Sequence, residues 1–458
     1  MDFMETPLGD EVRRVIDART GQPNYYIDAT IHTKFGDVQV LRVLNMDIMR
    51  EYMLQYTDEI SLIVLVPSGQ FTYKITPSRN ELEITLSGSP SDLHAAEEVS
   101  SDSYGQQRYR AVLKQANDPA LEANARELMD EFTMDSQDFE VLEFQLFSKP
   151  MEQFAMRSVG GIYRKTAVGD LIRSILLQTS QAAENVDDSY MPLGVDMVDP
   201  VDAQIRDHIV LDHGITAADA PGYIHKHCGG VYSAGFAYYY QDDYWYVFPP
   251  FNYQRFQEAT RHLMILIVPE NKMPQVDNTY IVEGSVVTIV CTGGLQLDDQ
   301  SDLNKRATGN GIRVADASKL FEQGVEVAGN KALMSRGKTN NEFISTPLKS
   351  GLNNVQVSPE RISANTMYQA SRLAAKEGVY INLVWDNCDP ALIRPGMQTR
   401  ITYFKEGAVS QVDAVVVAAQ IATGWEGSGI VSGRYNRNMA IRLFAANEAN
   451  QAADASAS

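Results

Sequence analysis

The feature that most constrains this chain is an alternation of apolar and polar residues in short segments about ten residues apart. In the first of these segments, Ile27, Ala29 and Ile31 alternate with polar residues. Turn-forming residues follow at 35–37, and apolar residues return at 38–43. A period of two places one set of side chains on one face, so the pattern predicts a hairpin with one buried face.

The same alternation continues through the first third of the chain. Further strands are predicted at 59–66, 70–76, 81–87, 104–113 and 138–147, separated by turn residues such as Pro67-Ser68-Gly69. Strands at this spacing, joined by short turns, indicate a closed or nearly closed antiparallel barrel. We place this first β-barrel at 25–148.

Two segments of the first third depart from the strand pattern. Residues 1–24 are polar, and we expect a flexible N-terminal segment there. A short helix is predicted at 47–56, where Ile48, Met49 and Tyr52 lie on an apolar stripe.

Beyond Pro150 the apolar period becomes helical. Helices are predicted at 167–180, with Thr166 as the cap, and at 216–228, where Gly229-Gly230 ends the helix. A polar link with two prolines occupies 191–202, and a hairpin is predicted from 236 to 248 around Asp242-Asp243. The region 149–262 is therefore predicted to be an inserted α+β region.

The last part of the chain returns to strands. They are predicted at 263–268, 285–292, 379–385, 397–404, 412–421 and 434–444. We place a second β-barrel region at 263–445, with a long polar insertion at 293–355, a helical pattern at 360–377 and a disordered tail at 446–458. The predicted fold class is strand-dominated α+β, with two antiparallel β-barrels around an inserted α+β region.

The segment 238–251 is the richest in aromatic residues, with eight among its 14 positions. Its candidate functional residues are Tyr244, Trp245, Tyr246, Phe248 and Phe251. Tyr and Trp are favoured at protein interfaces, so this segment can be a partner-binding surface. Alternatively, it is a hairpin whose aromatic residues alternate between a core face and a half-exposed face.

The overall charge excludes some partners. The chain has 39 basic and 59 acidic residues, which gives a net charge of −20. Such a charge disfavours adhesion to nucleic acid or anionic membranes, although a local basic patch is compatible with it. No apolar run reaches the length of a transmembrane helix, and no secretory signal is predicted. Three widely spaced cysteines suit a reducing cytoplasm rather than a disulfide framework.

The sequence offers weak candidates for a metal-binding or catalytic site. The cluster of His208, His213, His225, His227 and Cys228 could hold a metal, but residues two apart on a helix point in different directions. Surface or packing histidines are therefore favoured over a metal site. The chain has neither GxSxG nor a P-loop, and its carboxylates are scattered. We predict no enzymatic activity and no cofactor.

The aromatic segment also carries a family resemblance. Its Tyr-rich strand, acidic turn and Trp-Tyr-Val-Phe-Pro-Pro-Phe run (245–251) resemble the tail hub, or baseplate hub, protein of contractile-tailed bacteriophages and related injection systems. Residues 71–86 look like paired strands of the first barrel of such a hub, and 139–147 look like the strand that closes it. Residues 170–176 look like a short helix of its middle region. The resemblance extends over about 25–445.

The resemblance implies a structural role in a virion. Hubs of this family have two related barrels of tail-tube type, and three copies form a ring whose six barrels approximate the sixfold tail tube. The chain would be a homotrimer in the virion tail or baseplate, assembled in the bacterial host cytoplasm. The tail tube protein would dock on one face and the central spike protein on the other. DNA would pass through the lumen without stable binding, and no membrane is involved.

Two other functions remain open at this point. One is a peripheral baseplate or adhesin-like binding module, and the other is a cell-wall-degrading tail enzyme. The resemblance carries no catalytic residue onto this chain.

Overall fold

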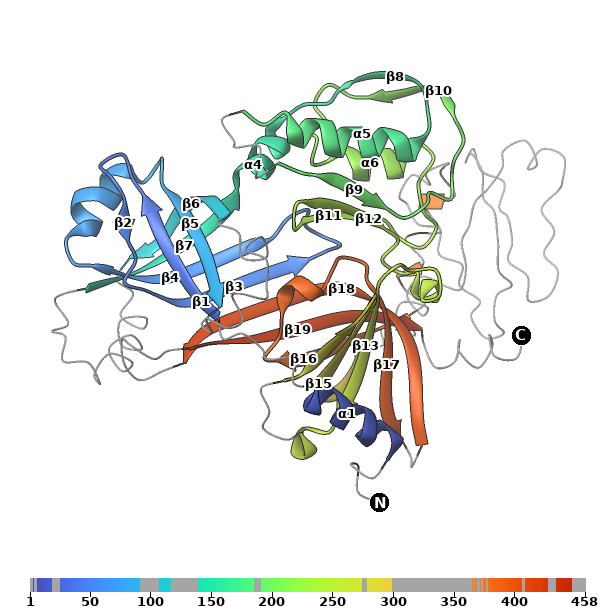
Figure 1. Cartoon of the computed structure of the whole chain (residues 1–458). Coiled ribbons are helices and arrows are strands. Elements are labelled where there is room, and N and C mark those ends of the chain that lie inside the picture. The colour runs from blue at the N-terminus through green and yellow to red at the C-terminus, as the bar shows by residue number, and fades with distance from the viewer. Residues whose placement is uncertain are drawn as a thin grey trace, which may run out of the picture.

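The chain is strand-dominated in a computed structural model (Figure 1). The structure describes residues 3, 6–18, 25–90, 107–116, 139–184, 191–273, 278–298, 365, 367, 368, 371, 374, 375, 378–405, 408–426 and 434–446. The predicted tail beyond 446, and most of the predicted insertion 293–355 and of the helical pattern 360–377, lie outside these residues.

A closed six-stranded barrel forms the C-terminal part of the fold. Its strands are β13 (His262–Val268), β15 (Val286–Asp298), β16 (Gly378–Asp386), β17 (Gln398–Lys405), β18 (Ala408–Glu426) and β19 (Arg434–Ala446). They pair in the order β17-β13-β15-β16-β19-β18, and the pairing of β17 with β18 closes the circle. The prediction of a barrel in this part of the chain is confirmed.

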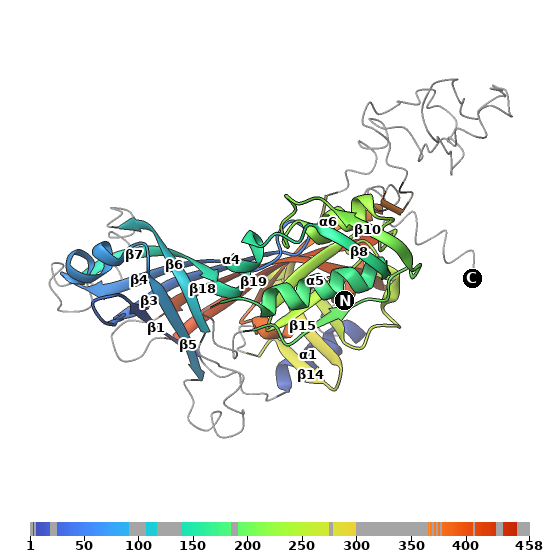
Figure 2. The same ribbon diagram turned by 90° about the horizontal axis from the view of Figure 1, so that it is seen from above.

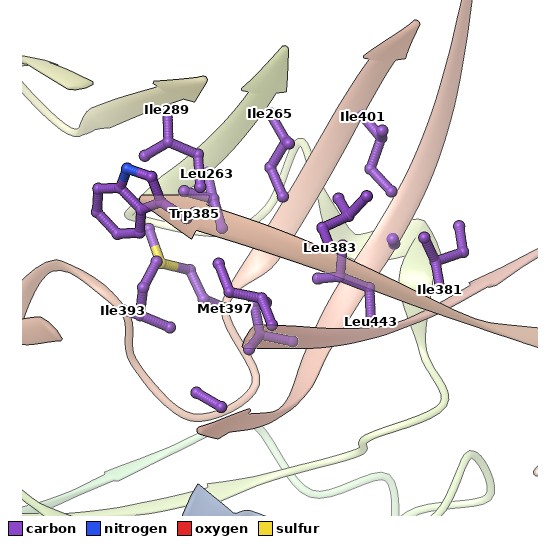
Figure 3. Packing of buried hydrophobic residues seen from close by; sticks show 14 of the residues in the cluster. Leu263, Ile265, Ile289, Ile381, Leu383, Trp385, Ile393, Met397, Ile401 and Leu443 are labelled. Atoms are coloured by element: carbon purple, nitrogen blue, oxygen red, sulfur yellow. The ribbon is translucent and has the colours of Figure 1, made fainter. Parts of the chain in front are cut away.

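The barrel is filled by branched aliphatic side chains. Leu263, Ile265, Ile289, Ile381 and Leu443 point into its interior from four different strands (Figure 3). These positions are the apolar members of the alternation in the sequence. Burial of an aliphatic side chain of this size contributes about 1.5–3 kcal/mol, so the alternation accounts for the closed core.

The prediction that this barrel is antiparallel is wrong for β13. That strand pairs in parallel with both β15 and β17. Its sequence, HLMILIV, is almost continuously apolar, which is typical of a strand that is buried on both faces. One face lies in the barrel core, while Leu266 and Val268 contact a helix on the outside.

That helix corrects the expectation of a flexible N-terminal segment. Helix α1 (Pro7–Asp17) begins with Thr6, whose side chain accepts a hydrogen bond from the Gly9 amide at 3.1 Å. Leu8, Val12 and Val15 are buried against the barrel. The polar residues of 7–17 lie on the opposite side of an amphipathic helix, so overall polarity was a misleading guide.

The first third of the chain forms a strongly curved sheet that is continuous with the barrel. Its strands are β1 (Tyr25–His32), β2 (Val38–Gln39), β3 (Arg42–Glu51), β4 (Glu59–Pro67), β5 (Glu83–Pro90), β6 (Gln107–Ala116) and β7 (Phe139–Ser148). From β18 the strand order continues β3-β4-β7-β6-β5-β1-β2, and all these strands belong to one 14-stranded sheet. Strand β14 (Tyr280–Glu283) belongs to the same sheet but lies off this path, where it pairs with the barrel strand β15.

The predicted helix at 47–56 is wrong, because residues up to Glu51 belong to β3. This strand has β4 on one side and β18 on the other. Backbone pairing with a strand on each side outweighs a local apolar stripe of helical spacing.

The predicted strand at 70–76 is also wrong. Residues Phe71–Ile75 form a π-helical turn, and Thr76–Ser78 form a 3-10 turn. Both neighbours, β4 and β5, already have a partner on each side, so no position in the sheet remains for this segment. It crosses the end of the sheet instead, where Ile75 and Leu82 fill the core. The first half of the segment 71–86 therefore differs from the paired strands that the resemblance implied.

The middle region stacks in layers on one end of the barrel. Its elements are α4 (Lys149–Met156), β8 (Gly161–Thr166), α5 (Val168–Gln181), β9 (Gly194–Met197), β10 (Arg206–Leu211), α6 (Ala220–His227), β11 (Ala237–Gln241) and β12 (Tyr244–Phe248). The sheet of β9, β11 and β12 lies next to the barrel, helices α5 and α6 cover it, and β8 and β10 lie outermost (Figure 1).

Three details of the middle region differ from prediction. The N-cap of α5 is Ala167 rather than Thr166, which is the last residue of β8 and pairs with Arg206. Helix α6 begins at Ala220, because Thr216 forms a bridge with Ser158 before the helix starts. The polar link 191–202 contains β9, which pairs in parallel with β12.

Two further observations complete the fold. Strand β15 continues to Asp298, past the predicted start of the polar insertion at 293. Among the described residues, the longest helices are too short and too polar to cross a membrane.

Candidate functional site: an aromatic hairpin between two cores

The aromatic segment forms the predicted hairpin. Strands β11 and β12 pair from Ala237↔Phe248 to Gln241↔Tyr244. Asp242 and Asp243 connect them, with left-handed φ values of 48° and 61°. Two successive residues of this conformation give the turn that matches the twist of a two-residue hairpin, and Asp tolerates it better than most residues.

One face of the hairpin packs against the helices. The Trp245 side chain is 0% exposed, and its ring centroid lies 5.0 Å from that of Phe154 on α4 and 5.4 Å from that of Tyr240. Its indole Nε1 donates a hydrogen bond to Ser180 Oγ on α5 at 3.2 Å. A buried indole with a satisfied N–H is a core residue of the helical layer.

The other face of the hairpin packs against the barrel. Tyr239, Tyr246 and Phe248 are buried in the same cluster as the barrel interior. Gly396, with a φ of 68°, passes so close to the Phe248 ring that a Cβ at this position would overlap the ring. The hairpin therefore covers one end of the barrel and shares its rings between two cores.

A buried polar network joins this barrel-facing side to the first sheet. The Arg50 guanidinium donates hydrogen bonds from Nε and Nη2 to Asp58, at 3.1–3.2 Å, and one from Nη1 to the Pro390 carbonyl at 3.2 Å. The Tyr239 hydroxyl donates to Asp58 Oδ1 at 2.9 Å. Arg50 comes from β3, Asp58 from the turn before β4, and Tyr239 from the hairpin, so three parts of the chain meet at one carboxylate.

A second set of hydrogen bonds lies beside the first. The Tyr52 hydroxyl donates to Gln241 Oε1 at 3.3 Å, and Gln241 Nε2 donates to the Ile393 carbonyl at 2.8 Å. The Tyr52 and Tyr239 rings meet edge to face, with centroids 4.8 Å apart. These contacts fix the tip of the hairpin against both the first sheet and the loop 390–393 of the barrel.

The electrostatics of the network follow from its burial. Burial alone would lower the pKa of Arg50, but the adjacent Asp58 carboxylate raises it above its usual value. Burial raises the pKa of Tyr239 and Tyr52, and the Asp58 charge raises both further. Arg50 therefore stays charged and both phenols stay neutral near pH 7, which suits a fixed structural junction.

Two of the five predicted aromatic residues lie at the margin of the hairpin. Tyr244 is 41% exposed at the tip, where its ring lies against Gly194. Phe251 lies beyond the Pro249-Pro250 pair, on the outer surface of the barrel. Its ring is 4.9 Å from that of Phe444. Of the five, Tyr244 is the most available to a partner.

The histidine cluster is dispersed by the fold. His225 is buried on α6, where Nδ1 accepts a hydrogen bond from the Val231 amide at 3.0 Å and Nε2 contacts Ser371 Oγ at 3.2 Å. Its ring stacks on Phe236, and burial lowers its pKa to about 4. His227 lies against Tyr223, while His208 belongs to β10. Among the described residues, no group of three or more His, Cys, Asp or Glu side chains is arranged to hold a metal ion.

The Arg50–Asp58 network was missed by the sequence interpretation. Its signal was available, because a charged residue stood at an inward position of an alternating strand. A charge at such a position requires a partner. The erroneous helix at 47–56 concealed that alternation.

This chain is similar to known proteins in its structure and not in its sequence. No family model and no curated protein sequence matches it. Similar solved structures include the tail protein from Neisseria meningitidis MC58, with a TM-score of 0.47 and 8% identity, covering 91% of this chain and 96% of that one. Another is the 43 kDa tail protein of prophage MuSo2 from Shewanella oneidensis, with a TM-score of 0.42 and 8% identity, covering 91% and 98%.

A third similar structure comes from a secretion machine. It is an Escherichia coli component of the type VI secretion system, described as similar to the bacteriophage T4 tail proteins gp27 and gp5. Its TM-score is 0.37 with 9% identity, covering 91% of this chain and 77% of that one. These three similar structures are two tail proteins and one secretion-system component.

Proposed function

We propose that this chain is a non-catalytic structural hub of a phage tail or a related injection machine. The observation that carries the proposal is the single 14-stranded sheet, in which the closed barrel and the first sheet are joined edge to edge through β18 and β3. Seven backbone pairs, from Ala418↔Glu51 to Gly424↔Asn45, make this joint. Two strand-built bodies fixed side by side are what an adapter between threefold and sixfold symmetry requires.

The first sheet supports the two-barrel arrangement through a bent segment, 38–51. Its first part pairs with β1, as in Thr30↔Gln39, and its second part pairs with β4. Between the two, the Val40 amide donates to the Ala29 carbonyl at 3.2 Å and the Leu41 amide to the Leu65 carbonyl at 2.8 Å. We take β2 and β3 as one bent strand that closes β1-β5-β6-β7-β4 into a second barrel.

On the joined sheet, one row of exposed side chains runs across neighbouring strands, from the first sheet to the barrel. Paired residues on neighbouring strands run from Glu59 through Met49, Gln420 and Ala440 to Val384. All five side chains are exposed, and Met49 and Val384 are exposed large apolar residues. An apolar contribution to an otherwise polar sheet face suits contacts between copies or with stacked tail proteins.

In the proposed assembly, three copies form a closed ring of six barrels. A cyclic trimer uses one heterologous interface three times. The tail tube protein would stack on one face and the central spike protein on the other. With a net charge of −20, the lumen would repel DNA phosphates rather than retain them.

The test is the size and symmetry of the purified chain. Sedimentation should give a trimer, or a trimer once tube and spike proteins are present, and images down the particle axis should show six barrels around a pore. A zymogram should give no clearing of peptidoglycan. A particle that stays monomeric with both partner proteins would refute the hub, and a lytic zone would favour a tail enzyme.

A further inference from the structure

The outermost layer of the molecule is a two-stranded ribbon with an unused face. Strands β8 and β10 pair with each other from Arg206↔Thr166 to Leu211↔Gly161. Within the described residues, neither strand pairs with a third one. An isolated pair of strands is only marginally stable in water, and both of its edges can accept another strand.

The inner face of the ribbon packs against the core of the middle region. Ile209 and Leu211 are buried among the residues of α5 and α6, and the Tyr163 hydroxyl donates to the Val159 carbonyl at 2.8 Å. The end of the ribbon is fixed by the Ser158↔Thr216 bridge and by the Val159 amide, which donates to the Ile215 carbonyl at 3.0 Å. The ribbon is therefore held in place without help from its outer face.

The outer face combines apolar and basic side chains. Ile162 and Val210 lie directly opposite each other and are 63% and 55% exposed. The next outward pair, two residues along, is Arg164 and His208, both exposed. Within the described part of the chain, Arg164 and the neighbouring Lys165 have no ion-pair partner.

The outer face of the ribbon therefore carries apolar side chains and a positive charge, on a chain whose net charge is −20. On the outer face, an arginine without an ion-pair partner beside an exposed aliphatic pair is complementary to a segment in which apolar and acidic side chains alternate. We propose that the ribbon is a docking site for an extended acidic–apolar segment of a partner protein, which adds as a strand beside β8. In this mode, backbone hydrogen bonds provide affinity and the side-chain pattern provides specificity.

The choice of a partner protein over a second copy rests on the proposed function. The ribbon lies on the far side of the helices from the sheet that joins the two barrels (Figure 1). Copies that meet through the sheet would leave the ribbon on the periphery, where other tail components can reach it.

The test uses the full chain and a fluorescent eight-residue peptide, Val-Glu-Val-Glu-Val-Glu-Val-Asp. We expect saturable binding in anisotropy titrations at low salt, at least tenfold tighter than for the same peptide with lysine at every acidic position. Arg164→Glu should weaken binding at least tenfold. Arg79→Glu, an equal change of charge at an exposed position in the turn before β5, should change it less than twofold.

Hydrogen exchange then distinguishes strand addition from diffuse attraction. The acidic peptide should protect amides within 161–166. Protection elsewhere, equal binding by Arg164→Glu, or absence of binding at 1 mM peptide would overturn the proposal. Sedimentation of the same samples reports ring formation separately, so failure of the hub leaves the peptide result interpretable. Self-association that Arg164→Glu abolishes would assign the ribbon to contacts between copies and would also overturn it.

Discussion

The two faces of the aromatic hairpin bury similar aromatic side chains but are held by different interactions. The face toward the helices, with Trp245 at its centre, is held by ring contacts and by one hydrogen bond to Ser180. The face toward the barrel combines rings with the charged network of Arg50, Asp58 and Tyr239. Apolar packing tolerates small shifts, whereas a charge-assisted network accepts one geometry. The first face therefore supplies stability, and the second fixes how the middle region sits on the barrel.

The largest expected effect is on the helical face. Trp245→Ala should lower the free energy of unfolding by about 3–5 kcal/mol, because it leaves a large cavity and removes the indole donor to Ser180 Oγ. Denaturant unfolding monitored by hydrogen exchange in α5 would measure it. Tyr244→Ala, at the half-exposed tip, should change stability by less than about 0.5 kcal/mol. Unchanged melting of Trp245→Ala with failed assembly would instead make Trp245 an interface anchor.

The barrel face should be nearly as sensitive to the loss of a charge. Arg50→Met leaves the Asp58 carboxylate without its cation, and we expect a loss of about 3 kcal/mol in unfolding experiments. The double variant Arg50→Met/Asp58→Leu should recover most of this loss, because no buried charge remains. If the double variant is as unstable as the single one, packing rather than charge pairing holds this face.

Acid should lower the stability of the middle region through protonation of His225. Its pKa is lowered to about 4 in the folded state, below the usual 6.5, so the unfolded chain binds the proton more readily. Stability contributed by neutral His225 is present above pH 6.5 and is lost as the pH falls toward 4, by up to about 3 kcal/mol. The difference in unfolding free energy between the wild type and His225→Gln should therefore change over this range. A difference that is constant with pH would contradict the assignment.

The smallest expected effect isolates one hydrogen bond of the barrel face. Tyr239→Phe removes the donor to Asp58 and keeps the ring, so we expect a loss of about 1.5 kcal/mol. Thermal unfolding of the full chain would measure it against Tyr246→Phe, whose ring lies on the same face. Equal losses in the two variants would show that the bond to Asp58 has no special weight.

Strands and helices could be predicted from the sequence wherever the spacing of apolar residues matches the face that is buried in the structure. The barrel strands and the hairpin around Asp242-Asp243 were predicted from period two, and helix α5 was predicted from helical spacing. The double-sided burial of β13 was readable as a nearly continuous apolar run, but its parallel pairing depends on which strands lie beside it. Pairing partners distant in sequence leave no local signal.

The errors have related physical causes. Strand β3 looked helical because its stripe was judged without the two strands that flank it. The turn at Phe71–Ile75 looked like a strand, although the sheet had no free edge at that point. Helix α1 carried its own signals, Thr6 before Pro7 and apolar residues at 8, 12 and 15, which the polar composition obscured. The buried charge network followed from tertiary contacts among three separate segments.

Strand β18 has a mechanical consequence. Its 19 residues pair with β17 and β19 in the barrel and with β3 in the first sheet. Figure 2 shows β18 extending from the barrel strand β19 toward the first sheet. A force applied along one body reaches the other through backbone hydrogen bonds loaded in parallel, without passing through a flexible hinge. The two bodies should thus move together as one rigid unit.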